Sequence, residues 1–136
     1  MKNIAIIGSG SWGIALAIHL ANKGNNVKVW SFAEEEKNLI NEEKKCKFLP
    51  KVRLPENIYC SQDFEEVLND ADLILHVTPS KFTRDIFRQY KEFVVNTPVI
   101  ICSKGFEKDT LKTLDEVIIE EKPDVRLGVL SGPSHA

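Results

Sequence analysis

The feature of this sequence that most constrains its fold is a glycine-rich hexapeptide near the amino terminus. Residues 8–13 read Gly-Ser-Gly-Ser-Trp-Gly, which matches the pattern G-x-G-x-x-G. A short apolar run, residues 3–7, precedes the hexapeptide, and a stretch with helical periodicity, residues 11–23, follows it. The pattern is informative only between a strand and a helix, and the sequence predicts that setting here.

Three glycines give this turn the properties of a diphosphate site. Gly8 permits a tight turn, Gly10 lets a pyrophosphate approach the bare backbone, and Gly13 lets the helix pack closely on the strand. The helix amino terminus adds free N–H groups and partial positive charge. A plain strand–helix turn with incidental glycines is the alternative. Ser11 either contacts phosphate or caps the helix, and Trp12 either faces the ligand or joins the core.

Strand and helix patterns alternate along the rest of the chain. We expect strands at residues 3–7, 27–30, 58–61, 72–78, 98–102 and 126–130. Helices are predicted at 11–23, 34–40, 63–69 and 111–121, and another has Phe82, Ile86, Phe87, Tyr90 and Phe93 on one face. Residues 41–57 form an irregular, charged excursion. This order predicts an α/β fold, a doubly wound parallel sheet of about six strands of the Rossmann type, with ligands at the strands' carboxyl ends.

Composition excludes several other classes of protein. The 136 residues amount to one domain, and 18 basic against 20 acidic side chains give a net charge of −2, which predicts no nucleic-acid partner and no membrane surface. No apolar run is long enough for a membrane span, and no secretory leader is evident. The cysteines Cys46, Cys60 and Cys102 are too widely spaced for a disulfide framework, so we expect a cytoplasmic protein. No metal-ligand spacing occurs.

The end of the second strand bears on the choice of dinucleotide. An acidic residue there favours NAD and an arginine favours NADP, but Trp30 is followed by Ser31, Phe32 and Ala33. Phe32 can flank an adenine. The acidic residues 34–36 oppose a 2′-phosphate, so NAD is slightly favoured over NADP. His19 and His76 are expected to be structural.

Six ordered motifs resemble those of the NAD(P)-dependent glycerol-3-phosphate dehydrogenases, over essentially the whole chain. They are the turn at 8–13 with Ile-Ala-Leu-Ala at 14–17, Lys-Phe-Leu-Pro at 47–50 with Leu-Pro at 54–55, Ala-Asp at 71–72, Val-Thr-Pro-Ser at 77–80, Ser-Lys-Gly-Phe-Glu at 103–107, and Leu-Ser-Gly-Pro-Ser at 130–134. The resemblance implies interconversion of sn-glycerol 3-phosphate and dihydroxyacetone phosphate by hydride transfer, for glycerophospholipid synthesis.

The resemblance also implies roles for single residues. The cofactor would contact Gly8, Ser9, Gly10, Ser11, Trp12, Gly13, Phe32, Phe82, Lys104 and Ala136, and the substrate would contact Lys104, Gly132 and Ser134. Bacterial members often have arginine at the position of Phe32, and His135 replaces a common phenylalanine, which we interpret as a packing change. Without the resemblance, Lys104 reads as a solvated lysine, and Phe82 as either a core residue or a lid.

The resemblance places the catalytic lysine in a second, helical domain that these 136 residues do not contain. We therefore expect no catalytic residue in this chain, and cofactor binding with little turnover. The full-length protein would be a homodimer through that domain, and this chain a monomer. A stand-alone redox-sensor module is one alternative, which a reading frame ending at Ala136 would favour. A 2-hydroxy acid or ketopantoate dehydrogenase is another, against which the motifs at 103–107 and 130–134 argue.

Overall fold

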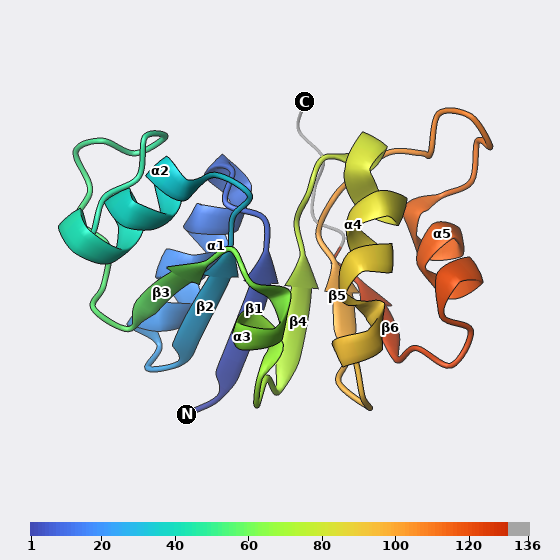
Figure 1. Cartoon of the computed structure of the whole chain (residues 1–136), viewed down its shortest axis with the longest axis horizontal. Coiled ribbons are helices and arrows are strands. Elements are labelled where there is room, and N and C mark those ends of the chain that lie inside the picture. The colour runs from blue at the N-terminus through green and yellow to red at the C-terminus, as the bar shows by residue number, and fades with distance from the viewer. Residues whose placement is uncertain (131–136) are drawn as a thin grey trace.

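A computed structural model describes residues 1–130 of the chain, and its centre is a parallel sheet of six strands (Figure 1). The spatial order is β3-β2-β1-β4-β5-β6, so the winding direction reverses between β1 and β4. The strands are β1 (Asn3–Ile7), β2 (Asn26–Trp30), β3 (Ile58–Ser61), β4 (Leu73–His76), β5 (Val99–Ile101) and β6 (Leu127–Val129). This arrangement confirms the predicted doubly wound α/β fold.

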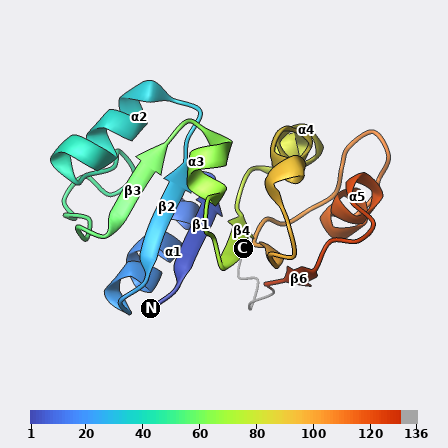
Figure 2. The same ribbon diagram turned by 60° about the horizontal axis from the view of Figure 1, so that its bottom comes forward.

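Helices cover both faces of the sheet (Figures 1 and 2). The α-helices are α1 (Ser11–Asn22), α2 (Glu34–Asn38), α3 (Phe64–Leu68), α4 (Thr83–Tyr90) and α5 (Leu114–Glu121). A π-helical turn, η1 (Leu39–Glu43), extends α2, and the 3-10 turns η2 (Ser80–Phe82) and η3 (Lys91–Phe93) flank α4. Within residues 1–130, no helix is both long and apolar enough to cross a bilayer.

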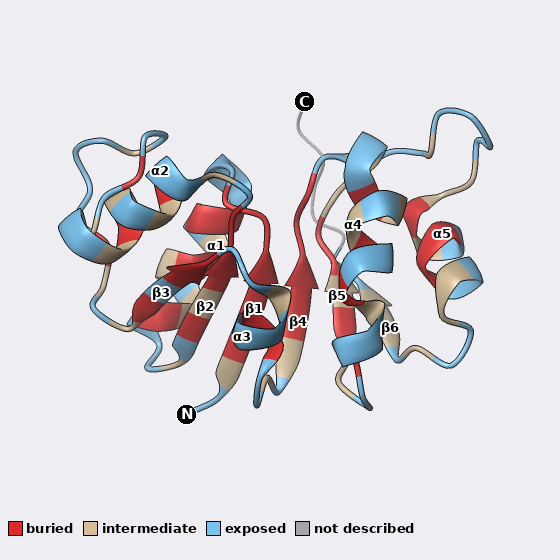
Figure 3. Ribbon diagram, viewed as in Figure 1, coloured by how far each residue is buried: buried red, intermediate tan, exposed pale blue. Residues whose placement is uncertain are grey.

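The apolar run of β1 is explained by burial on both of its faces (Figure 3). Ile4 and Ile6 belong to one core cluster, which includes residues from α1 and η1. Ala5 and Ile7 belong to the other cluster, which includes residues from α3, α4 and α5. Alternate residues of a strand point to opposite faces, so a central parallel strand must be apolar throughout.

His76 has the structural role expected for it. The side chain is fully buried in β4, its Nδ1 lies 2.7 Å from the Tyr90 hydroxyl, and its Nε2 lies 2.8 Å from Thr78 Oγ1. Burial lowers the pKa of His76 to about 4, so the ring is neutral at pH 7. The imidazole thus joins β4 to α4 within the core. His19 lies exposed on α1.

Several helix boundaries differ from those predicted. Phe82 and Phe93 lie in the flanking 3-10 turns and are 45% and 41% exposed, so neither extends the buried face of α4. Helix α5 begins at Leu114 rather than at 111, because Thr113 and Glu116 form a capping box there. Asp63 caps α3 by accepting from the Glu65 N–H at 3.0 Å.

The excursion between α2 and β3 is irregular, as expected, but it is anchored at both ends. The backbone N–H of Leu54 donates to the Lys44 carbonyl at 2.7 Å, and the Lys44 ammonium donates to the Ile58 carbonyl at 2.9 Å. The Asn41 amide donates to the carbonyl of Cys60 at 2.8 Å. Lys44 is therefore not simply solvated, and these hydrogen bonds tie the excursion to β3.

Candidate functional site

A cleft of about 830 Å³ lies at the carboxyl ends of the central strands, where the predicted ligand site should be. Its walls come from the segments that follow β1, β2, β4 and β5, together with part of the excursion. They include residues 8–13, 30–33, 77–80 and 102–104, with Glu36, Lys47, Phe48, Phe82 and Ile86. The cleft thus brings together five distant parts of the chain.

Two of the three glycines in the turn are required by the packing around them. Gly8 has φ +129°, and a Cβ there would lie 2.6 Å from the carbonyl oxygen of Val77. A Cβ at Gly13 would lie 2.4 Å from the carbonyl oxygen of Gly8. Gly10 differs, because a Cβ at that position would meet nothing within 4 Å and would occupy the open cleft.

The amino terminus of α1 opens on this cleft. The N-cap is Gly10, which has no side chain, and the first helical hydrogen bond runs from the Ile14 N–H to the Gly10 carbonyl at 2.9 Å. The N–H groups of Ser11, Trp12 and Gly13 precede that bond and have no intrahelical acceptor. Ser11 is the first helical residue and is exposed on the cleft, so it is not the helix cap.

Trp12 is a wall of the cleft and not a core residue. Its side chain is 51% exposed, and its indole Nε1 donates to the carbonyl of Cys102 at 3.2 Å. That hydrogen bond joins the start of α1 to the end of β5 across the switch point of the sheet. The large apolar ring is therefore held in one orientation beside the turn.

The segment after β2 forms one end of the cleft. Phe32 is 79% exposed at the cleft, whereas Ser31 and Glu36, which also line it, are buried. The Ser31 hydroxyl donates to Glu36 Oε2 at 3.4 Å, and it accepts from the Ala33 N–H at 3.2 Å. Glu36 Oε1 is buried and has no hydrogen-bond partner among the described residues.

The opposite end of the cleft is formed by the segments after β4 and β5. Phe82 projects from η2 at the cleft and is half-exposed, so it is not a core residue. Lys104 is exposed at the end of β5, beside Gly105, whose φ of +110° turns the chain away from the sheet. The Ser103 hydroxyl donates to the Thr78 carbonyl, which ties the two segments together.

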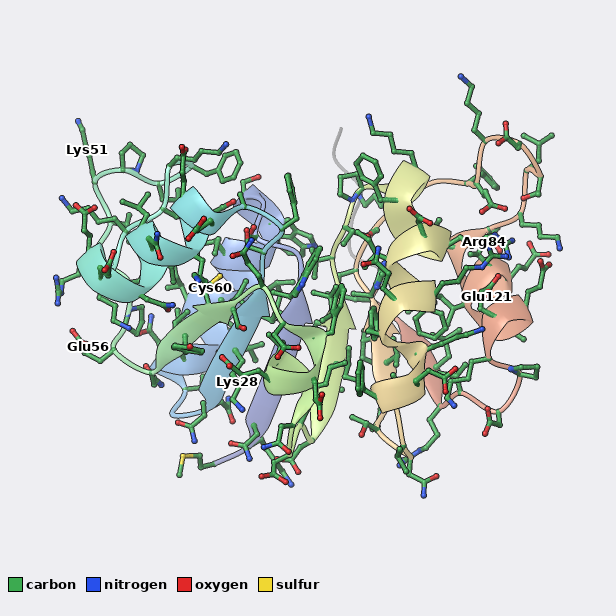
Figure 4. All side chains as sticks on the ribbon, in the orientation of Figure 1. Lys28, Lys51, Glu56, Cys60, Arg84 and Glu121 are labelled. Carbon is green, nitrogen blue, oxygen red and sulfur yellow. The ribbon has the colours of Figure 1, made fainter. Side chains whose placement is uncertain are left out.

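A network of ion pairs supports the segment that carries Lys104 (Figure 4). Arg84 on α4 donates to both carboxylate oxygens of Glu107, at 2.7 and 2.9 Å, and to Glu121 on α5 at 2.6 Å. The Arg84 hydrogen bonds hold the pKa of Glu107 at about 2. Hydrogen bonds from Arg88, and then from Arg84 and Lys91, hold the pKa of Glu121 at about 2. The network therefore joins α4, α5 and the segment after β5.

The predicted cofactor residues meet at the cleft, with some outside the described part of the chain. Gly8, Ser9, Gly10, Ser11, Trp12, Gly13, Phe32, Phe82 and Lys104 all line it. Gly132, Ser134, His135 and Ala136 lie outside the described residues. Within residues 1–130, no group of three His, Cys, Asp or Glu side chains could hold a metal ion.

Sequence reasoning missed two groups of cleft residues. Glu36 was treated as one of three nearby charges, although it lies one helical turn before buried Ile40 and so shares its face. Lys47 and Phe48 reach the cleft from the excursion, with the Lys47 ammonium 5.3 Å from the Phe48 ring centroid. No local pattern predicts where an irregular segment ends in space.

The strand order, with the glycine turn at the reversal point, defines a Rossmann-type α/β domain. The family described as NAD-dependent glycerol-3-phosphate dehydrogenase N-terminus matches residues 3–136, and the chain belongs to this family.

Similar proteins agree with this assignment. The chain is 41% identical to a Fusobacterium nucleatum glycerol-3-phosphate dehydrogenase [NAD(P)+], over all of this chain and 42% of that protein. It is also 41% identical to a glycerol-3-phosphate dehydrogenase [NAD(P)+] from Bacillus subtilis, over all of this chain and 41% of that protein. The crystal structure of the Coxiella burnetii glycerol-3-phosphate dehydrogenase superposes with a TM-score of 0.90 at 32% identity, covering 98% of this chain and 42% of that one. The chain thus spans about two fifths of the length of these relatives.

More distant structures share only the fold. A ketopantoate reductase from Ralstonia eutropha superposes with a TM-score of 0.70 at 18% identity, covering 93% of this chain and 39% of that one. Such a likeness shows the fold alone and carries no information about substrate.

Proposed function

We propose that this chain is the dinucleotide-binding domain of a glycerol-3-phosphate dehydrogenase, which interconverts sn-glycerol 3-phosphate and dihydroxyacetone phosphate with NAD or NADP. The observation that carries this proposal is the open space at Gly10, directly in front of the amino terminus of α1. Free N–H groups and the helix dipole favour an anion at that place. A side chain at Gly10 would occupy the space that the anion needs.

The rest of the cleft fits the remaining parts of a dinucleotide. Its volume of about 830 Å³ is within the range of small-molecule sites. Phe32 offers an exposed ring at one end, and Trp12 and Phe82 offer apolar surface along the cleft. A dinucleotide has two flat bases joined through a charged pyrophosphate. These parts match an apolar surface at each end of the cleft with an anion-binding surface between them.

The bound cofactor would accept hydride from the alcohol carbon or return it to the carbonyl carbon. The chain's own contribution is to bind and orient. Lys104 places an ammonium at the edge of the cleft, where it would attract the substrate phosphate or polarise the reacting oxygen. The Ser103 contact to Thr78 and the ion pairs of Arg84 keep that segment in place.

The proposal includes the parts of the site and the assembly that lie outside residues 1–130. Gly132 and Ser134 would contact the substrate, and Ala136 the cofactor, as the resemblance implies. The lysine that moves the proton would belong to a further helical domain, through which the full-length protein would form a homodimer. Residues 1–136 by themselves would be one domain and a monomer. A cytoplasmic location remains a prediction.

Titration of residues 1–136 with NADH and NADPH, followed by nicotinamide fluorescence, tests this function. We expect saturable binding of at least one dinucleotide and a loss of affinity of at least about tenfold in Gly10→Ser. Serine is a preferred N-cap residue, so this variant should fold normally. Absence of saturable binding of both dinucleotides would overturn the proposal.

A rate assay with glycerol 3-phosphate tests the division of labour between the domains. Residues 1–136 should oxidise it negligibly, because the proton-transferring lysine is proposed to lie elsewhere. A rate like that of an intact dehydrogenase would contradict this placement, while leaving the binding site itself unaffected.

A further inference from the structure

We propose that the Thr78 hydroxyl donates a hydrogen bond to the nicotinamide half of the dinucleotide, and that buried His76 and Tyr90 fix the direction of that hydroxyl. The inference rests on the proposed function, because it assumes that a dinucleotide occupies the cleft. It adds one ligand-binding hydroxyl, with two positioning residues in the core behind it, which the class of fold does not itself supply.

The hydrogen bonds that lead to Thr78 begin in the apolar core. Tyr90 on α4 is fully buried and belongs to the core cluster that contains Ala5 and Ile7. Its hydroxyl lies 2.7 Å from His76 Nδ1 and has no other hydrogen-bond partner within residues 1–130. A phenol hydrogen left without an acceptor in such surroundings is costly. The Tyr90 O–H therefore donates to His76 Nδ1.

That donation decides which ring nitrogen of His76 carries the hydrogen. Burial lowers the pKa of His76 to about 4, so the ring is neutral at pH 7 and has a single N–H group. Because Nδ1 accepts from Tyr90, the hydrogen is on Nε2, which lies 2.8 Å from Thr78 Oγ1. The Nε2–H group therefore donates to the Thr78 hydroxyl.

The Thr78 hydroxyl must then direct its own hydrogen away from His76. Its Oγ1 has no second partner within the described part of the chain, and Thr78 lines the cleft. Only 4% of the residue is exposed, so the hydroxyl has little access to bulk water. Successive hydrogen bonds polarise one another, which strengthens the last donor of the series. An acceptor atom of a bound ligand would satisfy this donor.

Thr78 lies near the part of the cleft proposed to hold the reacting end of the cofactor. Its backbone nitrogen would be 3.4 Å from a Cβ at Gly8, and its carbonyl accepts from the Ser103 hydroxyl. Thr78 is thus between the glycine turn and the segment of Lys104. Phe32 follows β2, on the other side of β1 from β4. The acceptor is therefore an oxygen of the nicotinamide ribose or of the carboxamide.

Calorimetric titrations of residues 1–136 with NADH and with ADP test the inference. ADP contains the adenosine and the diphosphate but no nicotinamide half. Thr78→Val keeps the shape of the side chain and removes the hydroxyl. NADH should then bind at least about fivefold more weakly, while the affinity for ADP stays the same.

The matched control is Thr97→Val. The Thr97 hydroxyl donates to the Val95 carbonyl at 3.3 Å, and both residues precede β5, at the edge of the sheet opposite the cleft. This variant should keep the wild-type affinity for NADH and for ADP. An equal loss of NADH affinity in the two variants would overturn the inference.

A second measurement needs no variant to fold. Long-range ¹H–¹⁵N NMR spectra distinguish the two neutral tautomers of a histidine, and we expect His76 to be the Nε2–H tautomer with and without NADH. The Nδ1–H tautomer would overturn the inference, because Thr78 would then donate to the ring.

Two results of the titrations would also overturn the inference. They are an unchanged NADH affinity in folded Thr78→Val and an equal loss of affinity for NADH and ADP in that variant. In each of these cases wild type still binds NADH. Failure of the proposed function is different, because then neither NADH nor NADPH binds saturably to wild type.

Discussion

Gly13 packs directly against Gly8, because a Cβ at Gly13 would lie only 2.4 Å from the Gly8 carbonyl oxygen. The two glycines at the ends of the hexapeptide are therefore needed for one contact between α1 and the end of β1. Gly10, between them, has a different reason for lacking a side chain, since the space in front of it is open. Folding and ligand binding make separate demands on the same turn.

Gly13→Ser and Gly10→Ser should separate these two demands. Serine at Gly13 must displace backbone, so we expect a loss of about 1–3 kcal/mol in the free energy of unfolding. Serine at Gly10 meets no atom, and the stability should change by less than about 0.5 kcal/mol while dinucleotide affinity falls. Urea denaturation followed by circular dichroism measures both. Equal stability of the two variants would show that the close contact is not tight in solution.

Phe32→Arg should raise affinity for NADPH by at least about tenfold, because a guanidinium forms bidentate hydrogen bonds with a phosphate. Phe32 is 79% exposed at the cleft, so the substitution should not disturb the core. Competition between NADPH and NADH provides the measurement. Phe32→Leu serves as the control, since it removes the ring without adding charge. If arginine and leucine variants show the same preference, this position does not contact the 2′-phosphate.

The ion pairs of Arg84 should make stability depend on pH in the acid range. Its hydrogen bonds hold the pKa of Glu107 at about 2, and those of Arg88, with smaller contributions from Arg84 and Lys91, hold the pKa of Glu121 at about 2. Both values lie below the usual 4.5, so the folded state favours the ionised carboxylates. Their contribution is complete above pH 4.5 and is lost as the pH falls toward 2. Arg84→Met should weaken this dependence, mainly through Glu107, and cost about 1–3 kcal/mol at pH 7, after allowance for partial solvent screening.

Urea denaturation at several pH values between 2 and 7 checks this expectation. Arg53→Met is a suitable control, because the Arg53–Glu56 pair has side chains that are 69% and 74% exposed. An exposed pair contributes little to stability. The same loss of unfolding free energy in both variants would mean that the ion pairs of Arg84 stabilise the fold no more than an exposed pair does.

His76 should produce a second acid transition at higher pH. Burial lowers its pKa in the folded state to about 4, from 6.5 when exposed, so the unfolded chain binds the proton more readily. Stability should therefore fall as the pH decreases from about 6.5 to 4. His76→Gln should be less stable at pH 7, because the Tyr90 and Thr78 contacts change, but it should lack this fall.

The matched control for His76 is His19→Gln, since His19 is exposed on α1. Its profile between pH 4 and 6.5 should match that of wild type. A His76→Gln profile that keeps the wild-type slope in this range would assign the transition to other groups.

The alternation of apolar runs and helical periodicities was sufficient to predict the order of the elements and the parallel sheet. The apolar residues of β1 are buried on both faces of the strand. The spacing of Ile14, Ala17, Ile18 and Ala21 predicts one buried side of α1, and all but Ile18, which is partly buried, are buried there. The glycine turn also followed from sequence, because the requirement for glycine at residues 8 and 13 is local and steric.

Boundaries were less predictable where a local cap competes with periodicity. Residues 111–113 continue the helical pattern of α5, but the Thr113–Glu116 capping box begins the helix at Leu114. Phe82 and Phe93 continue the pattern of α4 at either end, yet both lie in tighter 3-10 turns that expose them.

By itself, therefore, the sequence determined the class of fold and the place of the glycine turn, since both depend on short-range periodicity and on backbone sterics. Only the tertiary structure decided that Glu36, and neither Glu34 nor Glu35, faces the cleft, and that Lys47 reaches it from the excursion. These are outcomes of long-range packing. A side chain's solvent exposure depends on which distant segments close over it, and no local pattern records that.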